Sequence, residues 1–248
     1  MSGGAKGATT VEGQHRQPLW KAIAAAPEAV SSRDSWAQKV CLACVETIDQ
    51  VDAAILSLRA GPRSEEVLGA SDPWAARLAE LEYTAGEGPG AEAFETGSPV
   101  LVPDLNVDQV RWPGFAQTAL AAGVGAAFAF PLQFGAIRLG TLELVRHRPG
   151  GLTSPDTRDA ALAADLATAA LLRQSREAER AGLEFAPRAL ISYQDVHIAT
   201  GMLAAQLRIS LDDAFARLRA HAYSTNRPLL DVATDVLERR ITLEEPSE

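Results

Sequence analysis

Two cysteines, four histidines and one glycine-rich segment are the parts of this 248-residue chain whose residue types and spacing could do chemistry. Cys41 and Cys44 stand three residues apart, which is the spacing of a redox pair or of half a zinc site. A four-ligand zinc site needs two further donors, and the chain has no second cysteine pair. We therefore expect both residues to be structural thiols that pack as small apolar side chains.

The histidines and the acidic residues do not indicate a catalytic site. No two histidines stand at metal-ligand spacing, and none belongs to a recognisable Ser/His/Asp arrangement. We expect His147 to face solvent, and His197 and His221 to lie on the polar sides of C-terminal helices, whereas His15 falls in the N-terminal lead-in. No paired carboxylates share a motif, so the sequence predicts no catalytic residue, no metal and no cofactor.

The segment Gly86-Glu87-Gly88-Pro89-Gly90 resembles a phosphate-binding loop only in its glycine content. It lacks the Lys and Ser/Thr of a P-loop, and its third glycine comes too early for a dinucleotide-binding fingerprint. Two interpretations stay open. The segment is a loop whose glycines adopt positive φ, which we prefer, or a loop that contacts a ligand.

The elements that must position these residues are strands and helices up to about residue 180. Runs that alternate, or that are continuously apolar, predict strands at residues 53–58, 66–70, 99–102, 126–132 and 137–145. Gly135 lies between the last two runs, which together predict a β-hairpin. Helical spacing that begins at a capping residue or a proline predicts helices at residues 34–50, 72–81 and 154–180.

The third of these helices changes character along its length. Its first part is apolar enough to pack on a sheet, whereas residues 173–180 are almost all charged or polar. Gly182 and Pro187 then interrupt the helical pattern. We expect five parts: a disordered or partly helical segment at 1–33, a mixed α/β domain at 34–170, a helical connector at 171–186, a helical domain at 187–243, and an acidic tail at 244–248.

The C-terminal part of the chain has an all-helical pattern. Apolar residues recur at helical spacing in three stretches, which are separated near Ser210 and near Asn226. Ser210 is followed three residues later by Asp213, in the arrangement of a capping box. Three short amphipathic helices joined by tight turns predict a small bundle.

Four motifs in this bundle fall in one register with a known family. They are Ala199-x-Gly201-x-Leu203, Ser210-x-x-Asp213-Ala214-Phe215, Leu218-Arg219-x-x-Ala222 and Asn226-Arg227-x-Leu229-x-x-Val232-Ala233. The segment resembles an ANTAR domain, the three-helix module of transcription antitermination regulators. The resemblance implies that Ala199, Ala214, Leu218 and Val232 pack inside the bundle. We expect an exposed surface that could contact RNA, which consists of Thr200, Arg217, Arg219, Thr225, Asn226 and Arg227. From the residues alone, an arginine on such a surface is more often part of a solvated helix face. The resemblance favours an RNA contact at Arg219, Thr225 and Asn226.

One position departs from the ANTAR pattern. The family usually has lysine where this chain has Thr200. An ammonium group at that place could contact an RNA phosphate, so one such contact is missing here.

A second set of motifs lies in the α/β part. It consists of Gly86-Glu-Gly-Pro-Gly90, Gly97-x-Pro99-Val100-x-Val102-x-Asp104-Leu105, Arg111-Trp112-Pro113-Gly114-Phe115 and Gly140-x-Leu142. Residues 35–174 thereby resemble a GAF domain, a signal-sensing module. Many relatives carry cysteine where Gly90 stands, so thiol-based sensing at that place is not available to this chain.

Together the two resemblances imply a GAF and ANTAR regulator of the actinobacterial type. The fold class is then α+β: a GAF-like antiparallel sheet flanked by helices and joined by a helical connector to the three-helix bundle. The implied function is signal-responsive control of transcription termination through RNA hairpins in nascent transcripts. The sensor domain would receive an unknown small-molecule or protein signal, and the polar helix at 171–180 would pair two copies into a homodimer.

Two other function classes stay open at this stage. The first is a regulator whose bundle is a protein-docking or dimerisation module and binds no RNA. The second is an enzyme built on the α/β domain, which is the weakest interpretation because no nucleophile, base or metal set is visible. We expect a regulator and not an enzyme.

The charge of the chain bears on the RNA interpretation. A formal net charge of −9 argues against a protein that grips nucleic acid through bulk positive charge. However, residues 1–182 carry −6, residues 183–243 carry zero and the tail carries −3, so the acidity lies mainly outside the bundle.

Hydropathy bears on location. No run approaches the roughly 18 apolar residues of a membrane span, and residues 1–17 contain no apolar signal-peptide core. We therefore expect a cytoplasmic protein without a membrane partner.

Overall fold

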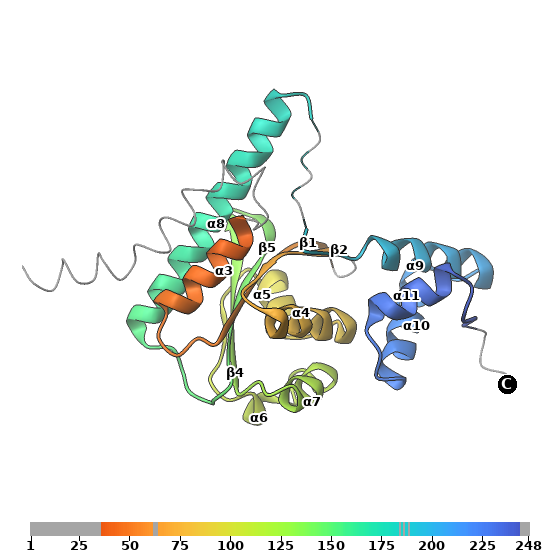
Figure 1. Cartoon of the computed structure of the whole chain (residues 1–248), viewed down its shortest axis with the longest axis horizontal. Helices are drawn as coiled ribbons and strands as arrows, with labels where there is room; N and C mark the ends of the chain where they lie inside the picture. The colour runs from red at the N-terminus through yellow and green to blue at the C-terminus, as the bar shows by residue number, and fades with distance from the viewer. Residues whose placement is uncertain (1–35, 62–63, 184, 186, 188, 244–248) are drawn as a thin grey trace, which may run out of the picture.

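The computed structural model describes residues 36–61, 64–183, 185, 187 and 189–243. A six-stranded antiparallel sheet with strand order β3-β4-β5-β1-β2-β6 has helices on both faces, and three more helices form a bundle beside it (Figure 1). The predicted α+β class is therefore confirmed. The expectations for residues 1–33 and for the tail at 244–248 lie outside the described residues.

The predicted strands all form, and one short strand is added. Their bounds are β1 (Ala53–Gly61), β2 (Ser64–Ala70), β3 (Val100–Val102), β4 (Ala126–Phe134), β5 (Ile137–Arg146) and β6 (Ile191–Ser192). The hairpin of β4 and β5 is confirmed, with Gly135 at φ 60° in its turn. The sequence did not predict β6, because two residues are too few to show a period. It pairs with β2 and so attaches the start of the bundle to the edge of the sheet.

Six helices pack around the sheet. They are α3 (Trp36–Thr47), α4 (Pro73–Ala85), α5 (Pro89–Thr96), α6 (Leu105–Asp108), α7 (Pro113–Ala121) and α8 (Ser154–Arg180). Helices α3 and α8 cover one face of the sheet, and α4 and α5 cover the other (Figure 1). The predicted helices correspond to α3, α4 and α8, whereas α5, α6 and α7 were not predicted.

Capping residues fix where two of these helices begin. The Asp72 carboxylate accepts a hydrogen bond from the Ala75 backbone N–H (2.8 Å) at the start of α4, and Pro73 occupies the first turn. Thr153 and Asp156 form a capping box at the start of α8. The predicted cap of α3, Asp34, lies outside the described residues.

The core under α3 and α8 is apolar. Phe128, Phe130 and Leu142 point to this side of the sheet and are almost fully buried. Cys41 and Cys44 lie in the same layer without a disulfide, and burial raises the pKa of the Cys44 thiol to about 12. A thiol held in its protonated form is a poor nucleophile and metal ligand. Both cysteines pack as small apolar side chains, as predicted.

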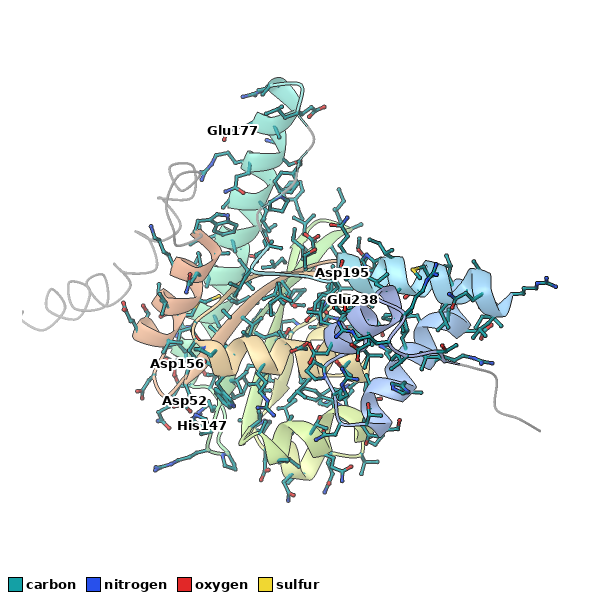
Figure 2. The ribbon with its side chains drawn as sticks, turned by 45° about the vertical axis from the view of Figure 1, so that its right-hand side comes forward. Asp52, His147, Asp156, Glu177, Asp195 and Glu238 are labelled. Atoms are coloured by element: carbon teal, nitrogen blue, oxygen red, sulfur yellow. The ribbon has the colours of Figure 1, made fainter. Side chains whose placement is uncertain are left out.

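The other expectations about reactive groups concern His147 and metals. His147 is exposed, as predicted, but it stacks on Trp74 with ring centroids 3.9 Å apart, and its backbone N–H donates to the Asp52 carboxylate (2.7 Å; Figure 2). Within the described ranges, no three His, Cys, Asp or Glu side chains gather where a metal ion could bind. None of the helices described is long and apolar enough to cross a membrane.

Candidate nucleic-acid interface

The bundle consists of α9 (Gln194–Leu207), α10 (Leu211–Ser224) and α11 (Leu229–Leu237). Helix α9 ends at Arg208 in a left-handed conformation, and the Ser210 hydroxyl then accepts a hydrogen bond from the Asp213 backbone N–H (3.0 Å). The four residues predicted to pack inside are all fully buried: Ala199, Ala214, Leu218 and Val232. The packing that the resemblance implies for these four residues is therefore confirmed.

The turn between α10 and α11 presents two of the predicted RNA contacts. Thr225 and Asn226 are both exposed there. The Thr225 hydroxyl donates to the His221 carbonyl (2.6 Å) and so ends α10. Asn226 adopts φ 51°, a conformation that asparagine tolerates better than most residues, and its side chain is left at the surface.

Thr200 does not belong to this surface, so its predicted exposure is wrong. It is buried, and its hydroxyl donates to the Val196 carbonyl (2.7 Å) one turn earlier in α9. The reason is helical geometry, because Thr200 lies on the same stripe as Val196 and Leu203, which faces the bundle core.

Arg217 and Arg227 are both half-buried; Arg217 lies in the middle of α10, and Arg227 lies in the turn that follows this helix. Within the described part of the chain, Arg217 has no ion-pair partner. The Arg227 guanidinium lies 2.7 Å from a carboxylate oxygen of Asp235, which Arg240 also contacts at 3.1 Å. The hydrogen bond from Arg227 lowers the pKa of Asp235, so this carboxylate stays charged and competes with any phosphate for Arg227.

Arg219 is half-buried, as Arg217 and Arg227 are, and its guanidinium contacts the sheet domain, a contact that the sequence did not predict. Its Nε and Nη2 groups both donate to the backbone carbonyl of Tyr83, at 3.2 and 2.9 Å. Tyr83 lies in the last turn of α4, where carbonyl groups have no partner within the helix and the dipole places partial negative charge. A cation is the fitting partner for that helix end.

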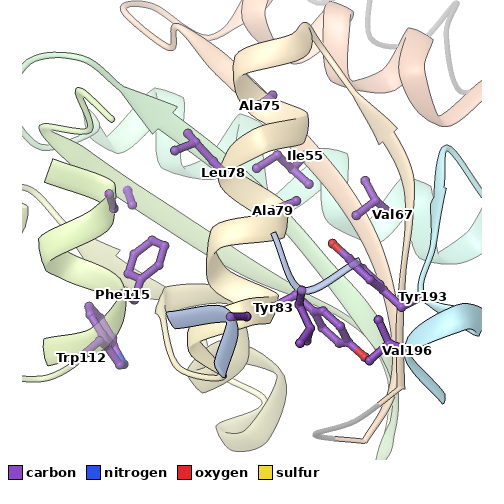
Figure 3. Packing of buried hydrophobic residues seen from close by; sticks show 14 of the residues in the cluster. Ile55, Val67, Ala75, Leu78, Ala79, Tyr83, Trp112, Phe115, Tyr193 and Val196 are labelled. Atoms are coloured by element: carbon purple, nitrogen blue, oxygen red, sulfur yellow. The ribbon is translucent and has the colours of Figure 1, made fainter. Parts of the chain in front are cut away.

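Aromatic rings surround this contact. The Tyr83 ring stacks on Tyr193, with centroids 3.7 Å apart, and lies 6.0 Å from the Phe215 ring. The Arg219 guanidinium carbon lies 4.5 Å from the centroid of Phe215, one turn earlier on α10. Figure 3 shows Tyr83 and Tyr193 with Val196 in the packed layer between α4 and the start of α9.

The sequence patterns did not indicate that Tyr83 and Tyr193 contact the bundle. A signal that could have indicated them is the pairing of Phe215 with Arg219 at a spacing of four, which places an aromatic ring and a cation on one face of α10. That face is neither a simple apolar stripe nor a simple charged one. It fits a partner surface that offers both an aromatic ring and a carbonyl group.

Behind Tyr83, the sheet domain buries a cluster of charged groups. Arg59 lies 2.9 Å from Glu65 and 3.1 Å from Glu82, and Glu143 lies on the same side of the sheet. Desolvation raises the pKa of Glu65 to about 7 and raises that of Glu143 well above its usual value. Glu82 also accepts the Ala91 backbone N–H (2.7 Å), so this cluster ties α4 to α5.

The glycine-rich segment lies at the same place. Gly86 (φ 74°) ends α4 and Gly88 (φ 156°) precedes α5, so the interpretation as a positive-φ segment holds for these two residues. Gly90 lies inside α5, where an added Cβ would lie 2.2 Å from a carboxylate oxygen of Glu143. Its glycine is therefore required for close packing and not for a turn.

A cleft of about 830 Å³ separates the two parts next to the packed contact. Its walls come from α4 and α7 on one side and from the α10–α11 turn on the other. The polar side chains that line it are Arg77, Glu80, Thr84, Gln117, Thr118, Tyr223, Asn226 and Arg227. At its edge, the Tyr223 hydroxyl lies 3.5 Å from the Gln117 side-chain oxygen.

Solved structures of low sequence identity resemble the sheet domain. The GAF domain of a phosphoenolpyruvate-protein phosphotransferase from Acinetobacter has 9% identity and a TM-score of 0.48 over 66% of this chain and 95% of that one. Free methionine-R-sulfoxide reductase from Neisseria meningitidis has 13% identity and a TM-score of 0.48 over 72% and 96% of the two chains. No curated protein matches the sequence.

Family models match both parts of the chain. The model of the ANTAR domain matches residues 186–237, which contain α9, α10 and α11. The model of the GAF domain matches residues 30–172, more than half of the chain, including the sheet from β1 to β5 and the helices on both of its faces. The chain therefore belongs to the GAF domain family and carries an ANTAR domain after its GAF domain.

Proposed function

We propose that this protein is a signal-responsive RNA-binding regulator, and not an enzyme, which controls transcription termination by binding RNA hairpins through its ANTAR domain. The GAF domain at residues 34–170 would serve as the sensor, residues 171–186 as the helical connector and residues 187–243 as the RNA-binding domain. The observation that carries the proposal is the α10–α11 turn. It presents Thr225 and Asn226 at the surface next to the partly exposed Arg227, and the partly exposed Arg217 lies about two turns earlier on α10.

These groups suit a hairpin loop. Guanidinium groups bind phosphates and stack on unpaired bases, and amide and hydroxyl groups read base edges in loops. Residues 183–243 carry no net charge, so bulk attraction to RNA is weak. Selection would then depend on the shape of the loop, in agreement with a hairpin target. Such a regulator acts on nascent transcripts, and we place it in the cytoplasm.

The test is a titration of the full chain against a synthetic double-hairpin leader RNA at several salt concentrations. Arg217→Ala is expected to weaken binding to all hairpins and to lower the salt slope by about 1, because one phosphate contact is lost. Asn226→Gly keeps the left-handed backbone and removes the amide, so it is expected to relax discrimination between loop sequences. Arg148→Ala removes the same charge from an exposed position of the GAF domain and serves as the control.

Unchanged affinity and salt slope in Arg217→Ala would contradict the assigned contact. The alternative is a bundle that docks proteins only. Crosslinking in cells distinguishes the two, since a docking module recovers protein and little transcript, whereas an RNA-binding regulator recovers transcripts that share a double-hairpin motif.

We also propose a homodimer through the connector. The end of α8 extends beyond the sheet, with Glu177 near its tip (Figures 1 and 2). A groove of about 570 Å³ runs along this part of α8, where it borders Phe134 at the β4–β5 turn. Phe134 and Ile137 are 63% and 60% exposed, an apolar surface that a second copy of α8 and its hairpin would cover.

A further inference from the structure

The contact between Arg219 and α4 gives a predicted RNA contact a partner in the GAF domain. Both donor groups of Arg219 that face α4 are used by a single acceptor, the Tyr83 carbonyl oxygen. A phosphate oxygen of RNA would bind the same N–H groups in the same plane. The helix end and the RNA phosphate are therefore alternative acceptors for one guanidinium.

The approach of Arg219 depends on Gly86. A Cβ at this position would lie 1.9 Å from Nη1 of Arg219 and 2.1 Å from its Cζ, so a side chain there displaces the guanidinium. Gly86 also ends α4 with φ 74° and donates its N–H to the Glu82 carbonyl (2.8 Å). The residue that ends the helix thus also leaves the space into which Arg219 fits.

The rest of this face of α10 is also covered. Phe215 and Leu218 are buried in one apolar cluster with Tyr83 and Tyr193. Tyr193 directly follows β6, which pairs with β2, so the stacked ring stands at the junction between the sheet and α9. RNA that reached Arg219 would have to displace α4 from this face.

The contact between the bundle and α4 is closely packed on one side only. Next to the Tyr83 layer, the two domains are separated by the cleft of about 830 Å³. Asn226 and Arg227 line this cleft. This part of the α10–α11 turn therefore faces open space and does not pack against the GAF domain. Interfaces of this kind between domains of one chain commonly allow relative motion.

The GAF interior has a direct connection to the contact. Glu82 and Tyr83 are neighbours on α4: the Glu82 carboxylate binds Arg59 in the buried cluster, and the Tyr83 carbonyl binds Arg219. A change that moves the end of α4 therefore acts on both groups at once. Rearrangement inside the sensor would change the acceptor available to Arg219.

We propose that the GAF domain masks Arg219, so that docking of the bundle on α4 and binding of RNA exclude each other. This inference rests on the RNA-binding function proposed above. A signal that shifts the end of α4 releases the bundle, and RNA binding in turn holds it released. The two effects are equal in size by linkage.

The test uses Gly86→Asn in the full chain. Asparagine tolerates the left-handed backbone, and its side chain takes the space of the Arg219 guanidinium without changing any residue of the RNA surface. Gly135→Asn is the matched control, since Gly135 has φ 60° in the same domain and an added Cβ meets nothing within 4 Å. Arg219→Lys is the second variant, because it keeps the charge and loses the planar fork that donates twice to Tyr83.

Two readouts separate docking from RNA binding. Hydrogen exchange at residues 83–90 and 215–222 reports docking, and titration with the double-hairpin RNA reports affinity. Gly86→Asn is expected to accelerate exchange in both segments and to raise RNA affinity about tenfold, as a tenfold larger competent population would. Arg219→Lys is expected to accelerate exchange in the same segments, and Gly135→Asn to change neither readout. Adding RNA to the unchanged protein should also accelerate exchange at 83–90.

Three other outcomes would contradict the masking, the docking contact or the proposed function. Faster exchange with unchanged or weaker RNA affinity in Gly86→Asn would overturn the masking. Unchanged exchange in both Gly86→Asn and Arg219→Lys would overturn the assigned contact. Faster exchange with no RNA binding by any variant, the unchanged protein included, would overturn the proposed function and leave the docking contact in place.

Discussion

The backbone carbonyl of Tyr83 accepts two hydrogen bonds from the side chain of Arg219, which lies 136 residues further along the chain. This contact joins the end of a GAF helix to the middle of the central ANTAR helix. It gives a residue of the predicted RNA surface a partner inside the same molecule. Replacing Arg219 by alanine removes a possible RNA contact and the docking contact together. Substitution of a residue that Arg219 contacts, such as Gly86, separates the two roles.

The first prediction concerns pH and Glu65. Burial raises the pKa of Glu65 from 4.5 to about 7, so the folded protein holds this proton more tightly than the unfolded chain does. The free energy of unfolding is therefore expected to fall as pH rises from about 4.5 to about 7, by up to about 3 kcal/mol from this group. Urea unfolding across this range measures it.

Glu65→Gln is expected to make that pH dependence shallower. Some slope should remain, because burial also raises the pKa of Glu143. Glu66→Gln, the adjacent residue on β2, is the control and should keep the slope of the unchanged protein. If Glu65→Gln kept that slope as well, Glu65 would not titrate in this range.

The second prediction concerns Thr200. Its hydroxyl is buried and already donates to the Val196 carbonyl, so Thr200→Ala should leave RNA affinity within about twofold of the unchanged protein, since a group that RNA cannot reach adds nothing to its affinity. The same change should cost about 1 kcal/mol of stability, as for other small deletions in a packed helix face. Electrophoretic titration and thermal unfolding measure the two effects. A loss of RNA affinity larger than the loss of folded protein explains would indicate that Thr200 does contact RNA.

The third prediction concerns Asp235, which competes for Arg227. Asp235→Asn removes the charge that holds the guanidinium and is expected to strengthen RNA binding a few-fold, since Arg227 becomes available to a phosphate. The stability cost should be small, because Arg227 and Arg240 are partly exposed and solvent screens their attraction to Asp235. Titration at two salt concentrations measures the gain. Asp231→Asn, an exposed acid of α11, is the control, and an equal gain there would indicate a general effect of charge.

The fourth prediction concerns the homodimer. Phe134→Ser combined with Ile137→Ser removes the two exposed apolar side chains beside α8 and is expected to shift the mass in solution from two copies toward one. Light scattering over a concentration series measures the shift. Val107→Ser combined with Val110→Ser removes side chains that are 73% and 85% exposed elsewhere on the GAF domain, and it should leave the mass unchanged. A single-copy mass of the unchanged protein at all concentrations would exclude this dimer.

Local patterns in the sequence determined much of the fold. Alternation along the β4–β5 hairpin and helical spacing in the bundle predicted elements that the structure contains. Ala214 and Leu218 were correctly assigned to the bundle core, because they stand four residues apart on the apolar stripe of α10. The packing of Ala199 was implied by the family motif. The sequence missed β6 and α6, which are too short to show a period.

The tertiary structure alone decided which faces of the helices are free. Thr200 and Arg219 both belong to motifs of the family, yet one faces the bundle core and the other faces α4. The spacing within α10 shows that Phe215 and Arg219 share a face, but it carries no information on the distant helix end that covers it. That partner is set by β6, which joins the edge of the sheet and brings α9 and α10 against Tyr83. The sequence by itself determined β1 to β5, the helices α3, α4 and α8 and the three helices of the bundle, because those depend on neighbours along the chain. The docking of Arg219 on Tyr83 is a contact between residues far apart in the chain, which only the folded arrangement creates.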